Sequence, residues 1–406
     1  MAIRAIVTAD WHIGKRLHQE DLSEDLQIYF NWLLEKIRDH SVDYLLVAGD
    51  IFDHQNPSND SSKLYFDFIS KLLGTGCKGV FIAGNHDSPG YIDHPASLLE
   101  HLGISVRGFF PGLENVGKVF VPLKNRSGEV EAVVAAIPFL QDRFVRHMGE
   151  GEGASEIAQK IKSGIRKVFE EVQSAKDRLY PDIPCIGLAH LHAQGTIQDE
   201  TEREIQIGNL EGMPADGLGR FDYLALGHIH TGQAVVPGRI QYASSPISLG
   251  FSENRYNHKI ILLDIDGKDI RETFLPVPKS RSLYQVKGTL EEVKEAIERL
   301  NGKYVLASLL DILVEEQEFN PNVQGAIENW KATLPDDKRL KVANVRIRYQ
   351  NTHTLTTGEE NPLTATELSP ITVFEGLINE RSDAGEKSAL LELFREIYSE
   401  ATQHNT

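Results

Sequence analysis

Short apolar runs alternate with amphipathic segments through the first part of the chain. The runs Ile3–Val7, Tyr44–Val47 and Val80–Ala83 have the length and the β-branched content of buried strands. Between them, the segments from about Leu22 to Asp39 and from about Ser61 to Leu73 place apolar residues at helical spacing. This order predicts right-handed crossovers and a largely parallel sheet.

Further strand-like runs follow, with one long helical segment among them, from about Ala154 to Lys176. The runs are Val119–Pro122, Val130–Ile137, Ile186–Leu188, Ile205–Ile207, Tyr223–Leu226, Ile240–Ala243, Ile260–Ile265 and Thr273–Val277. We therefore predict an α/β fold, α+β overall, in which two sheets pack face to face as a sandwich flanked by helices.

The pattern changes at Pro276–Ser282, where two prolines and a polar stretch interrupt the strands. Beyond this point, Thr289 and Glu292 have the spacing of a capping box and predict a helix between strand-like runs. The runs are Leu283–Lys287, Tyr304–Val314 and Lys341–Tyr349. We predict a first domain over residues 1–278 and a small α+β domain over 279–350.

The remaining residues, 351–406, have the pattern of a polar linker followed by two short amphipathic helices, about Ile371–Ile378 and about Lys387–Ser399. Two short helices cannot bury their apolar faces alone. They either pack back on the body of the protein or dock another protein.

Composition restricts the setting in which this protein works. The only cysteines are Cys77 and Cys185, so a reducing compartment is the default. The first strand begins at Ile3 and leaves no room for a cleavable signal peptide, and no apolar run approaches the roughly 18 residues of a membrane helix. We expect a cytoplasmic protein with no membrane partner. The net charge of −17 argues against a protein that coats nucleic acid through a wide basic face.

Side chains that bind metals recur where the predicted strands stop. Gly84-Asn85-His86-Asp87 follows one strand, and the same pattern holds for the other members of the set: Asp10, His12, Asp50, His190, His228 and His230. A mixture of imidazole and carboxylate ligands suits manganese, iron or zinc. Hydrolysis of a phosphodiester needs a nucleophile at neutral pH and a counter to the charge on the phosphorus. Two metals with a bridging carboxylate supply both, so we predict a two-metal phosphoesterase.

The individual motifs differ in weight. A lone Gly-Asp is common, and two surface histidines resemble His228-x-His230. His192 lies two residues from His190, and either of them could face the site. The joint occurrence of the set, in order and at strand ends, carries the prediction.

These residues resemble the signature of the calcineurin-like metallophosphoesterases. Within that superfamily the chain is most similar to SbcD-type nuclease subunits, the bacterial relatives of the eukaryotic break-repair nuclease. The similarity rests on Thr8–Gly14, Gly49–Asp53, Ser245-Pro246 and Phe251–Glu253. One departure is Asp53, which stands where archaeal and eukaryotic relatives tend to have a histidine.

The resemblance implies roles for the candidate residues. Asp10, His12, Asp50 and His230 would hold one metal, and Asp50, Asn85, His190 and His228 the other. His86 would be the catalytic histidine that donates to the scissile phosphate or protonates the leaving oxygen; the alternatives are a further metal ligand or a structural residue. Asp87 would orient an imidazole from behind.

The resemblance also implies a Mn²⁺-dependent exonuclease on double-stranded DNA and endonuclease on single strands or hairpins, associated with the nucleoid and active in DNA repair, recombination and replication. It implies a homodimer that joins the SMC-like ABC ATPase SbcC as a heterotetramer. Lys15, Arg16, Arg143 and Arg146 are weak candidates for DNA phosphate contacts, since each is a common surface charge. The alternatives are a phosphoesterase acting on small nucleotides or phosphoprotein, and a mainly structural subunit that tethers DNA ends.

Overall fold

The computed structural model describes residues 2–141, 154–199, 212–317 and 322–349, with the pairs 390–391 and 393–394. Several predicted features lie outside these residues: the strand at Ile205–Ile207, the side chains of Arg143 and Arg146, the polar linker and, apart from the two pairs, the C-terminal helices. The chain divides into two compact units, one of residues 1–314 with 324–346 and one of 315–323 with 347–406. All the candidate site residues belong to the first unit.

The first sheet has six strands in the order β14-β13-β1-β4-β5-β6. Their bounds are β1 Ile3–Thr8, β4 Tyr44–Ala48, β5 Lys78–Ile82, β6 Ile104–Arg107, β13 Lys259–Asp266 and β14 Asp269–Pro276. Strands β1, β4, β5 and β6 pair in parallel, whereas β13 pairs antiparallel with both β1 and β14. The largely parallel sheet predicted from the strand–helix alternation is confirmed.

The second sheet also has six strands, in the order β11-β12-β10-β9-β8-β7. Their bounds are β7 Phe120–Lys124, β8 Val130–Ile137, β9 Cys185–His190, β10 Tyr223–Gly227, β11 Ala234–Val236 and β12 Ile240–Tyr242. Its four central strands are parallel, and the edge strands β7 and β11 are antiparallel to their neighbours. The carboxyl ends of β9 and β10 therefore meet at one edge of this sheet.

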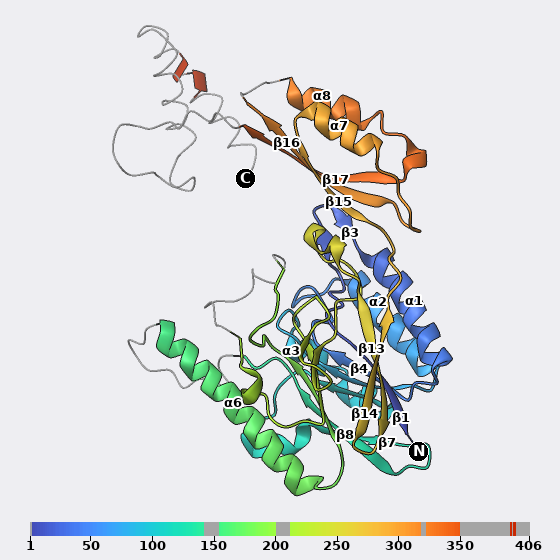
Figure 1. The fold of residues 1–406 in the computed structure, drawn as a ribbon, viewed down its shortest axis with the longest axis vertical. Helices are drawn as coiled ribbons and strands as arrows, with labels where there is room; N and C mark the ends of the chain where they lie inside the picture. The colour runs from blue at the N-terminus through green and yellow to red at the C-terminus, as the bar shows by residue number, and fades with distance from the viewer. Residues whose placement is uncertain are drawn as a thin grey trace. The chain divides into compact units, whose positions relative to one another are not determined.

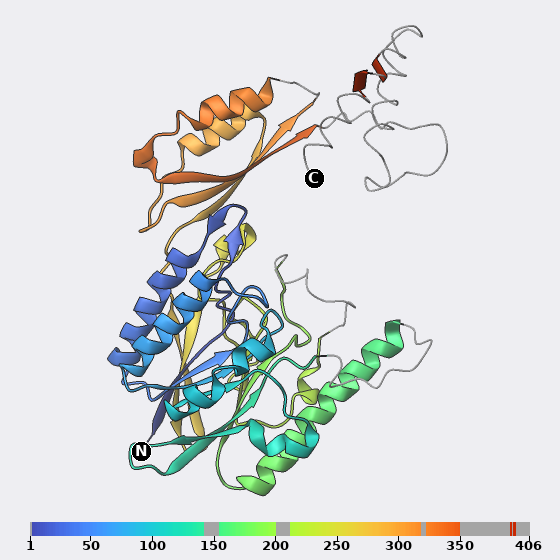
Figure 2. The ribbon, with the colours of Figure 1, turned by 180° about the vertical axis from the view of Figure 1, so that it is seen from behind.

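The two sheets pack face to face through their apolar side chains, among them Val7 and Val80 from the first sheet and Ile186 and Leu188 from the second. Helices α1 (Ser23–Asp39) and α2 (Asn59–Leu73) cover the outer face of the first sheet, and the long helix α6 (Ala154–Leu179) packs on the second (Figures 1 and 2). The predicted sandwich flanked by helices is confirmed.

Several short elements have no clear signal in the sequence. They are β2 Arg16–Leu17, β3 Glu20–Asp21, α3 Pro89–Asp93, α4 Ala96–His101 and the 3₁₀ turns η1 Leu113–Val119, η3 Ala215–Gly217, η4 Phe251–Arg255 and η5 Asp336–Lys338. Most are too short for a hydrophobic period to show.

The segment after the sandwich forms a three-stranded sheet in the order β15-β16-β17 with two helices. The bounds are β15 Leu283–Gly288, α7 Leu290–Glu298, β16 Ser308–Glu316, α8 Val323–Lys331 and β17 Leu340–Tyr349. The capping box at α7 is present: the Thr289 side chain accepts from the Glu292 amide, and Glu292 accepts from the Thr289 amide at 2.8 Å. The domain boundaries at 278 and 350 stay predictions.

The end of the predicted boundary stretch, Pro276–Ser282, is bound to helix α1 by hydrogen bonds and an ion pair. Arg281 Nε donates to Oδ1 of Asp25 on α1 at 2.9 Å, and a terminal nitrogen of Arg281 forms an ion pair with Oδ2 at 2.7 Å. Ser280 also donates a hydrogen bond to Oδ1. Both charged side chains are nearly buried, with 9% and 3% of their surface exposed. A buried, two-pronged ion pair of this kind fixes direction as well as position.

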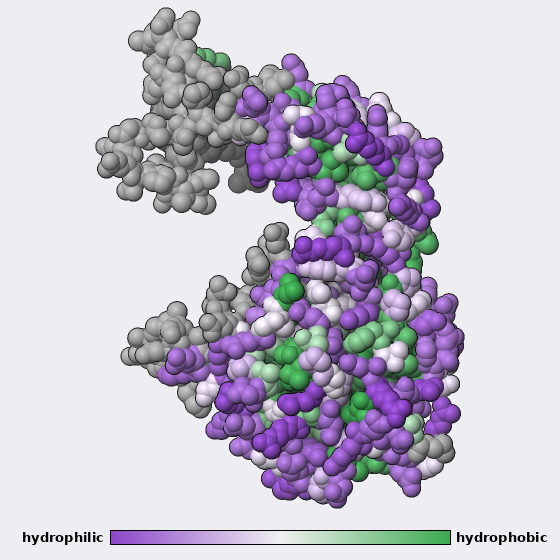
Figure 3. Space-filling view, viewed as in Figure 1, coloured by the Kyte–Doolittle hydropathy of each residue, from purple (hydrophilic) through white to green (hydrophobic). Residues whose placement is uncertain are grey.

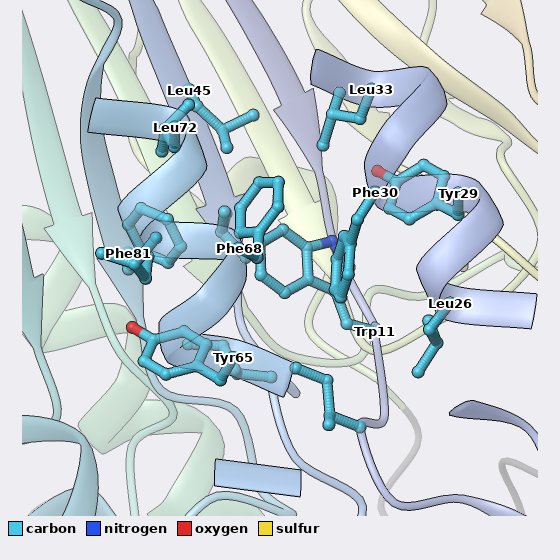
Figure 4. Close-up of a cluster of buried hydrophobic side chains, with 14 of the residues drawn as sticks. Trp11, Leu26, Tyr29, Phe30, Leu33, Leu45, Tyr65, Phe68, Leu72 and Phe81 are labelled. Atoms are coloured by element: carbon cyan, nitrogen blue, oxygen red, sulfur yellow. The ribbon is translucent and has the colours of Figure 1, made fainter. Parts of the chain in front are cut away.

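An aromatic cluster lies between the first sheet and helices α1 and α2 (Figure 4). The fully buried Trp11 is in edge-to-face contact with Phe30, Phe68 and Phe81, with ring centroids 5.0, 5.2 and 5.9 Å away. Its indole N–H donates to the Thr8 hydroxyl at 3.1 Å, which in turn pairs with the Tyr29 hydroxyl at 2.8 Å. Trp11 therefore fixes the chain between Asp10 and His12.

On the face shown in Figure 3, hydrophilic residues predominate and the hydrophobic ones form small groups among them. Among the described residues, no helix is long and apolar enough to cross a membrane.

Replacing Trp11 with alanine should destabilise the sandwich by about 3–5 kcal/mol, because the indole packs on three aromatic rings and satisfies Thr8. Calorimetry would show a lower midpoint of thermal unfolding. Trp32→Ala, at a partly buried position packed against the same cluster, is the control and should lower the midpoint less. Equal shifts for the two variants would contradict the central role of Trp11.

Candidate metal centre

The predicted ligands come together where strands of both sheets end. Asp10 and His12 follow β1, Asp50 follows β4 and Asn85 follows β5, all from the first sheet. From the second sheet, His190 ends β9, and His228 and His230 follow β10. Potential ligand atoms lie within 4.8 Å of one another in three groups: Asp10, His12 and His230; His12, Asp50 and His86; and Asp50, His190 and His228.

The backbone at four of these residues is in the left-handed region. The φ angles are 54° at Asp10, 46° at His12, 51° at Asp50 and 101° at His228. Positive φ is uncommon for residues other than glycine and each instance costs about 1–3 kcal/mol. The side chains of Asp10 and His12, and those of His228 and His230, do not converge along extended strands, because β1 ends at Thr8 and β10 at Gly227. The paired side chains converge through turns instead.

Hydrogen bonds between the loops hold these turns in place. The Asp10 amide donates to the Gly49 carbonyl and the His12 amide to the Asp50 carbonyl, both at 3.0 Å. Gly84 lies so close to Asp50 that an added Cβ would be 2.1 Å from its Oδ1, so this position requires glycine. The His86 amide donates to that same oxygen at 2.9 Å.

Three imidazoles are oriented from behind by an oxygen atom at Nδ1. The Nδ1 atom of His12 is 3.1 Å from Asp53 Oδ1, and that of His230 is 2.8 Å from Glu253 Oε1. His190 donates its Nδ1 proton to the Ala48 carbonyl at 2.8 Å. These contacts leave the Nε2 atoms of all three rings for the centre.

The Asn85 amide oxygen lies between two imidazoles of the second sheet. It is 2.8 Å from His190 Nε2 and 3.0 Å from His228 Nδ1. His190 Nε2 is also 3.3 Å from the Asp50 carboxylate. His190 is thus the histidine among these atoms, whereas the ring of His192 lies 6.3 Å from that of His228.

His86 stands at the edge of the centre and is only partly buried. Its ring contacts that of His12 edge to face, with centroids 4.6 Å apart, and its Nδ1 donates to the Asp53 carbonyl at 2.9 Å. Its second ring nitrogen is therefore the one available for chemistry.

Asp87 supports the backbone. Its carboxylate accepts from the amides of Gly84, Phe52 and Ile51 at 2.8, 2.8 and 3.1 Å. We expected Asp87 to orient an imidazole. These contacts instead join the loop of Asp50 to the loop of Asn85 through the Asp87 carboxylate.

Burial and mutual charge set the protonation of the centre. Burial raises the pKa of Asp10 to about 8 and lowers the pKa of His12 to about 4. Burial opposes charge on Asp50 too, but the imidazoles of His190 and His12 hold its pKa well below the usual range. Burial works against the charged form of His190, and the Asp50 and Asp10 carboxylates outweigh it, raising the pKa of His190 to about 9.

Two buried atoms at the centre, Asp10 Oδ2 and His12 Nε2, have no hydrogen-bond partner among the residues that the structure describes. A buried polar atom without a partner costs about 1–3 kcal/mol, so two such atoms in one ligand group point to a bound species. A carboxylate oxygen and an imidazole nitrogen together fit a divalent transition metal. The donor set therefore fits metal ions.

Sequence reasoning assigned no role to two carboxylates of the centre, Asp53 and Glu253. Both stand in stretches that carry the family resemblance, and both are buried. For Asp53 the available signal was its place directly after the buried Phe52, whereas Glu253 lies between Ser252 and Asn254 and carried no comparable signal. Their partners, 41 and 23 residues away, become apparent only in the fold.

Comparison with known families matches two parts of the chain. Residues 3–232 match the family model of the calcineurin-like phosphoesterases, and residues 279–382 match that of the type 5 capsule protein repressor C-terminal domain.

Among curated relatives, the D subunit of the nuclease SbcCD from Escherichia coli K12 is 30% identical over 401 residues, covering 97% of each chain. The protein of the same name from Rhodobacter capsulatus is 31% identical over 310 residues, covering 73% of this chain and 76% of the relative. Among solved structures, protein TT1561 of Thermus thermophilus aligns with 68% of this chain and 99% of its own, at 14% identity and a TM-score of 0.37.

Binding of a divalent cation should release protons and strengthen with pH. Below pH about 8 the cation competes with the proton of Asp10, and below about 9 with that of His190. The affinity should rise by up to about tenfold per pH unit for each proton displaced. Titration calorimetry with Mn²⁺ at pH 6.5 and 8, in buffers of different ionisation heat, measures both quantities. Equal affinity at the two pH values with no proton release would contradict these protonation states.

Proposed function

The chain belongs to the calcineurin-like phosphoesterase family and, within it, to the family of the SbcCD nuclease D subunits, and we propose that it is a DNA nuclease subunit that hydrolyses phosphodiesters with two divalent metal ions. The single observation that carries the proposal is the convergence of the complete ligand set on one buried centre with two unsatisfied ligand atoms. Similarity over 97% of the chain supports the nuclease-subunit role beyond phosphoesterase chemistry alone.

We assign Asp10, His12, Asp50 and His230 to one metal, and Asp50, Asn85, His190 and His228 to the other. Two of the three ligand groups correspond to these halves and support the assignment. The family is divalent-metal dependent, and the mixture of imidazole and carboxylate favours Mn²⁺ over Mg²⁺. When bound, such ions lower the pKa of a water molecule and offset the negative charge of the phosphate.

The residues of the chain supply orientation and proton transfer. Asp53, Glu253 and the Ala48 carbonyl set the tautomers of three imidazoles, so that each ring presents Nε2 without rearrangement. His86, locked through Nδ1 to the Asp53 carbonyl, presents Nε2 at the partly open edge of the centre. We assign His86 to donate a hydrogen bond to the scissile phosphate or a proton to the leaving oxygen.

DNA is the proposed substrate, at ends and at hairpins, which would place the protein at the nucleoid. The net charge of −17 means that a single chain offers little general attraction for DNA. A partner would then carry much of the DNA-binding surface, and we propose an SbcC-type SMC-like ABC ATPase in this role. Assembly as a homodimer, and as a heterotetramer with the ATPase through the C-terminal residues, belongs to the same proposal.

Purified protein should cut end-labelled duplex and hairpin DNA with Mn²⁺, less well with Mg²⁺ and not with EDTA. Asp50→Ala should lower the cleavage rate by at least about 10³-fold, because it removes the carboxylate common to both halves of the centre. Gel electrophoresis of the products measures the rate and the polarity.

The outcomes separate the candidate functions. If neither duplex nor hairpin is cut, with or without the ATPase, while a small chromogenic phosphodiester is hydrolysed, the chain is a small-molecule phosphoesterase. If no phosphodiester is hydrolysed, the hydrolytic proposal fails, and a role in tethering DNA ends is left.

His86→Ala should retain both metals and lose hydrolysis, by about 10²- to 10⁴-fold, the range of a lost acid–base group. Elemental analysis of metal content beside the cleavage assay separates the two effects. His101→Ala, at an exposed histidine at the end of α4, is the control and should cut DNA normally. Loss of a metal from His86→Ala would make His86 a ligand instead.

A further inference from the structure

A basic hollow lies at the end of the sandwich opposite to the metal centre, where Figure 1 marks the N-terminus. Its lining comes from the residues just before β4, the start of β5 and the turn between β7 and β8, whereas the candidate ligands follow the strands. Strand β4 has five residues of roughly 3.3 Å each, so about 16 Å or more separate the hollow from the centre. The cations that line the basic hollow are Arg38, Lys78, Lys124 and Arg126.

The basic hollow is large and continues into a neighbouring one. Its volume is about 430 Å³, within the roughly 300–1,000 Å³ of ligand-binding pockets. The neighbouring hollow, of about 300 Å³, adds Arg4 together with its ion-pair partner Asp264. The residues common to both hollows are Ser41, Asp43, Asn125 and Arg126. Two adjoining hollows with cations along both suit an extended chain of anionic groups better than a single compact anion.

The charge of the basic hollow is opposite in sign to that of the chain as a whole. Asp43 is the one carboxylate among the described residues that line it. Arg126 pairs with Asp43 at 3.5 Å, but its side chain is 71% exposed, and such surface pairs are weak. The other three cations, Arg38, Lys78 and Lys124, form no ion pair within the part of the chain that the structure describes. In a chain of net charge −17, these three positive charges are left for an anion from outside.

Hydrogen bonds fix the backbone that carries these cations. The hydroxyl of the buried Tyr44 donates to the Lys124 carbonyl at 3.0 Å and accepts from the Lys124 amide at 2.7 Å, which joins β4 to β7. The Asn125 side chain accepts from the amides of Ser127 and Glu129 at 2.9 and 3.0 Å, and so fixes the turn between β7 and β8. A site whose shape exists before the ligand arrives loses less conformational entropy on binding.

The lining is suited to phosphate groups and not to bases. Guanidinium and ammonium groups bind phosphate oxygens through charge-assisted hydrogen bonds. Tyr44 is the one aromatic residue among the described residues of the lining; it is 4% exposed, and the Lys78 ammonium lies 5.7 Å from its ring centre. A base therefore finds no open ring to stack on. Contacts to phosphate alone position a nucleic acid without reading its sequence.

Resting on the nuclease function proposed above for the identity of the anion, we infer that the basic hollow is a second nucleic-acid site, which binds the sugar–phosphate backbone of DNA away from the metal centre. Arg38, Lys78 and Lys124 are its phosphate contacts. The site gives the chain a local attraction for DNA that the net charge of −17 does not give to its surface as a whole.

Binding of a short, labelled duplex of mixed sequence to the full-length protein tests the inference, measured by fluorescence anisotropy at several salt concentrations. EDTA is present, so that no strand is cut. Lys124→Gln should weaken binding by at least about threefold and lower the slope of log affinity against log salt by roughly 0.9, the value for one lost phosphate contact on duplex DNA. The double variant Lys78→Gln/Lys124→Gln should lower the slope by about twice as much.

Matched variants separate a local site from general electrostatics. Lys167→Gln removes an exposed cation on α6 and changes the net charge by the same amount as Lys124→Gln, but it should alter neither the affinity nor the slope. Arg38→Gln should weaken binding from a different element, which guards against a folding defect peculiar to the β7–β8 turn. Arg38→Lys keeps the charge and should bind within about twofold of the wild type.

The results distinguish this inference from the proposed function. Equal duplex binding by the wild type, the double variant and Lys167→Gln overturns the inference, and Mn²⁺-dependent cleavage then still supports the nuclease. A mononucleotide that binds where the duplex does not, and loses affinity in the double variant, makes the hollow a site for small phosphates and overturns the inference too. Duplex binding that is lost in the double variant, in a protein that hydrolyses no phosphodiester with Mn²⁺, supports the second site and overturns the hydrolytic function alone.

Discussion

The structure depends above all on the electrostatic constraint of placing two carboxylates side by side out of water. Asp10 and Asp50 are buried at the junction of the two sheets, and burial alone would keep both neutral. The surrounding imidazoles give the two carboxylates different protonation states. Asp50 stays charged next to a charged His190, while Asp10 retains its proton. The centre is therefore prepared for cations, because an added positive charge relieves the repulsion that the fold imposes.

The fold maintains this arrangement with rigid support on every side. Trp11 lies between Asp10 and His12 in the sequence and its indole is buried, so the loop that carries these two candidate ligands is anchored in the aromatic core. Asp87 accepts hydrogen bonds from three backbone amides and joins the loops of Asp50 and Asn85. Four of the candidate ligand residues have left-handed backbone geometry, a conformation that persists only where the surroundings determine it. Apolar packing and polar contacts thus both hold the candidate ligands in place.

The sequence predicted those parts that depend on local pattern. Hydrophobic periodicity located helices α1, α2 and α6 and most strands of the two large sheets, but not β6 or β11. The convergence of Asp10, Asp50 and Asn85 therefore followed from the topology of the first sheet. It did not predict that Asp53 and Glu253 lie behind His12 and His230, because those contacts depend on how loops 41 and 23 residues apart fold together. Nor did it predict the left-handed turns, since Asp10, His12 and His228 are not glycines. The choice between His190 and His192 likewise required knowing which of the two side chains faces the centre at the end of β9.

The span of the centre along the chain has a consequence for how the protein is made. Its side chains run from Asp10, near the start, to Glu253, and each half takes its side chains from both sheets. A nascent chain that has reached β6 holds Asp10, Asp50 and Asn85 but none of the histidines of the second sheet. On the proposed assignment, it cannot retain a metal pair until more than half of the protein has left the ribosome. Synthesis order thereby keeps a potentially destructive activity silent during the first half of translation.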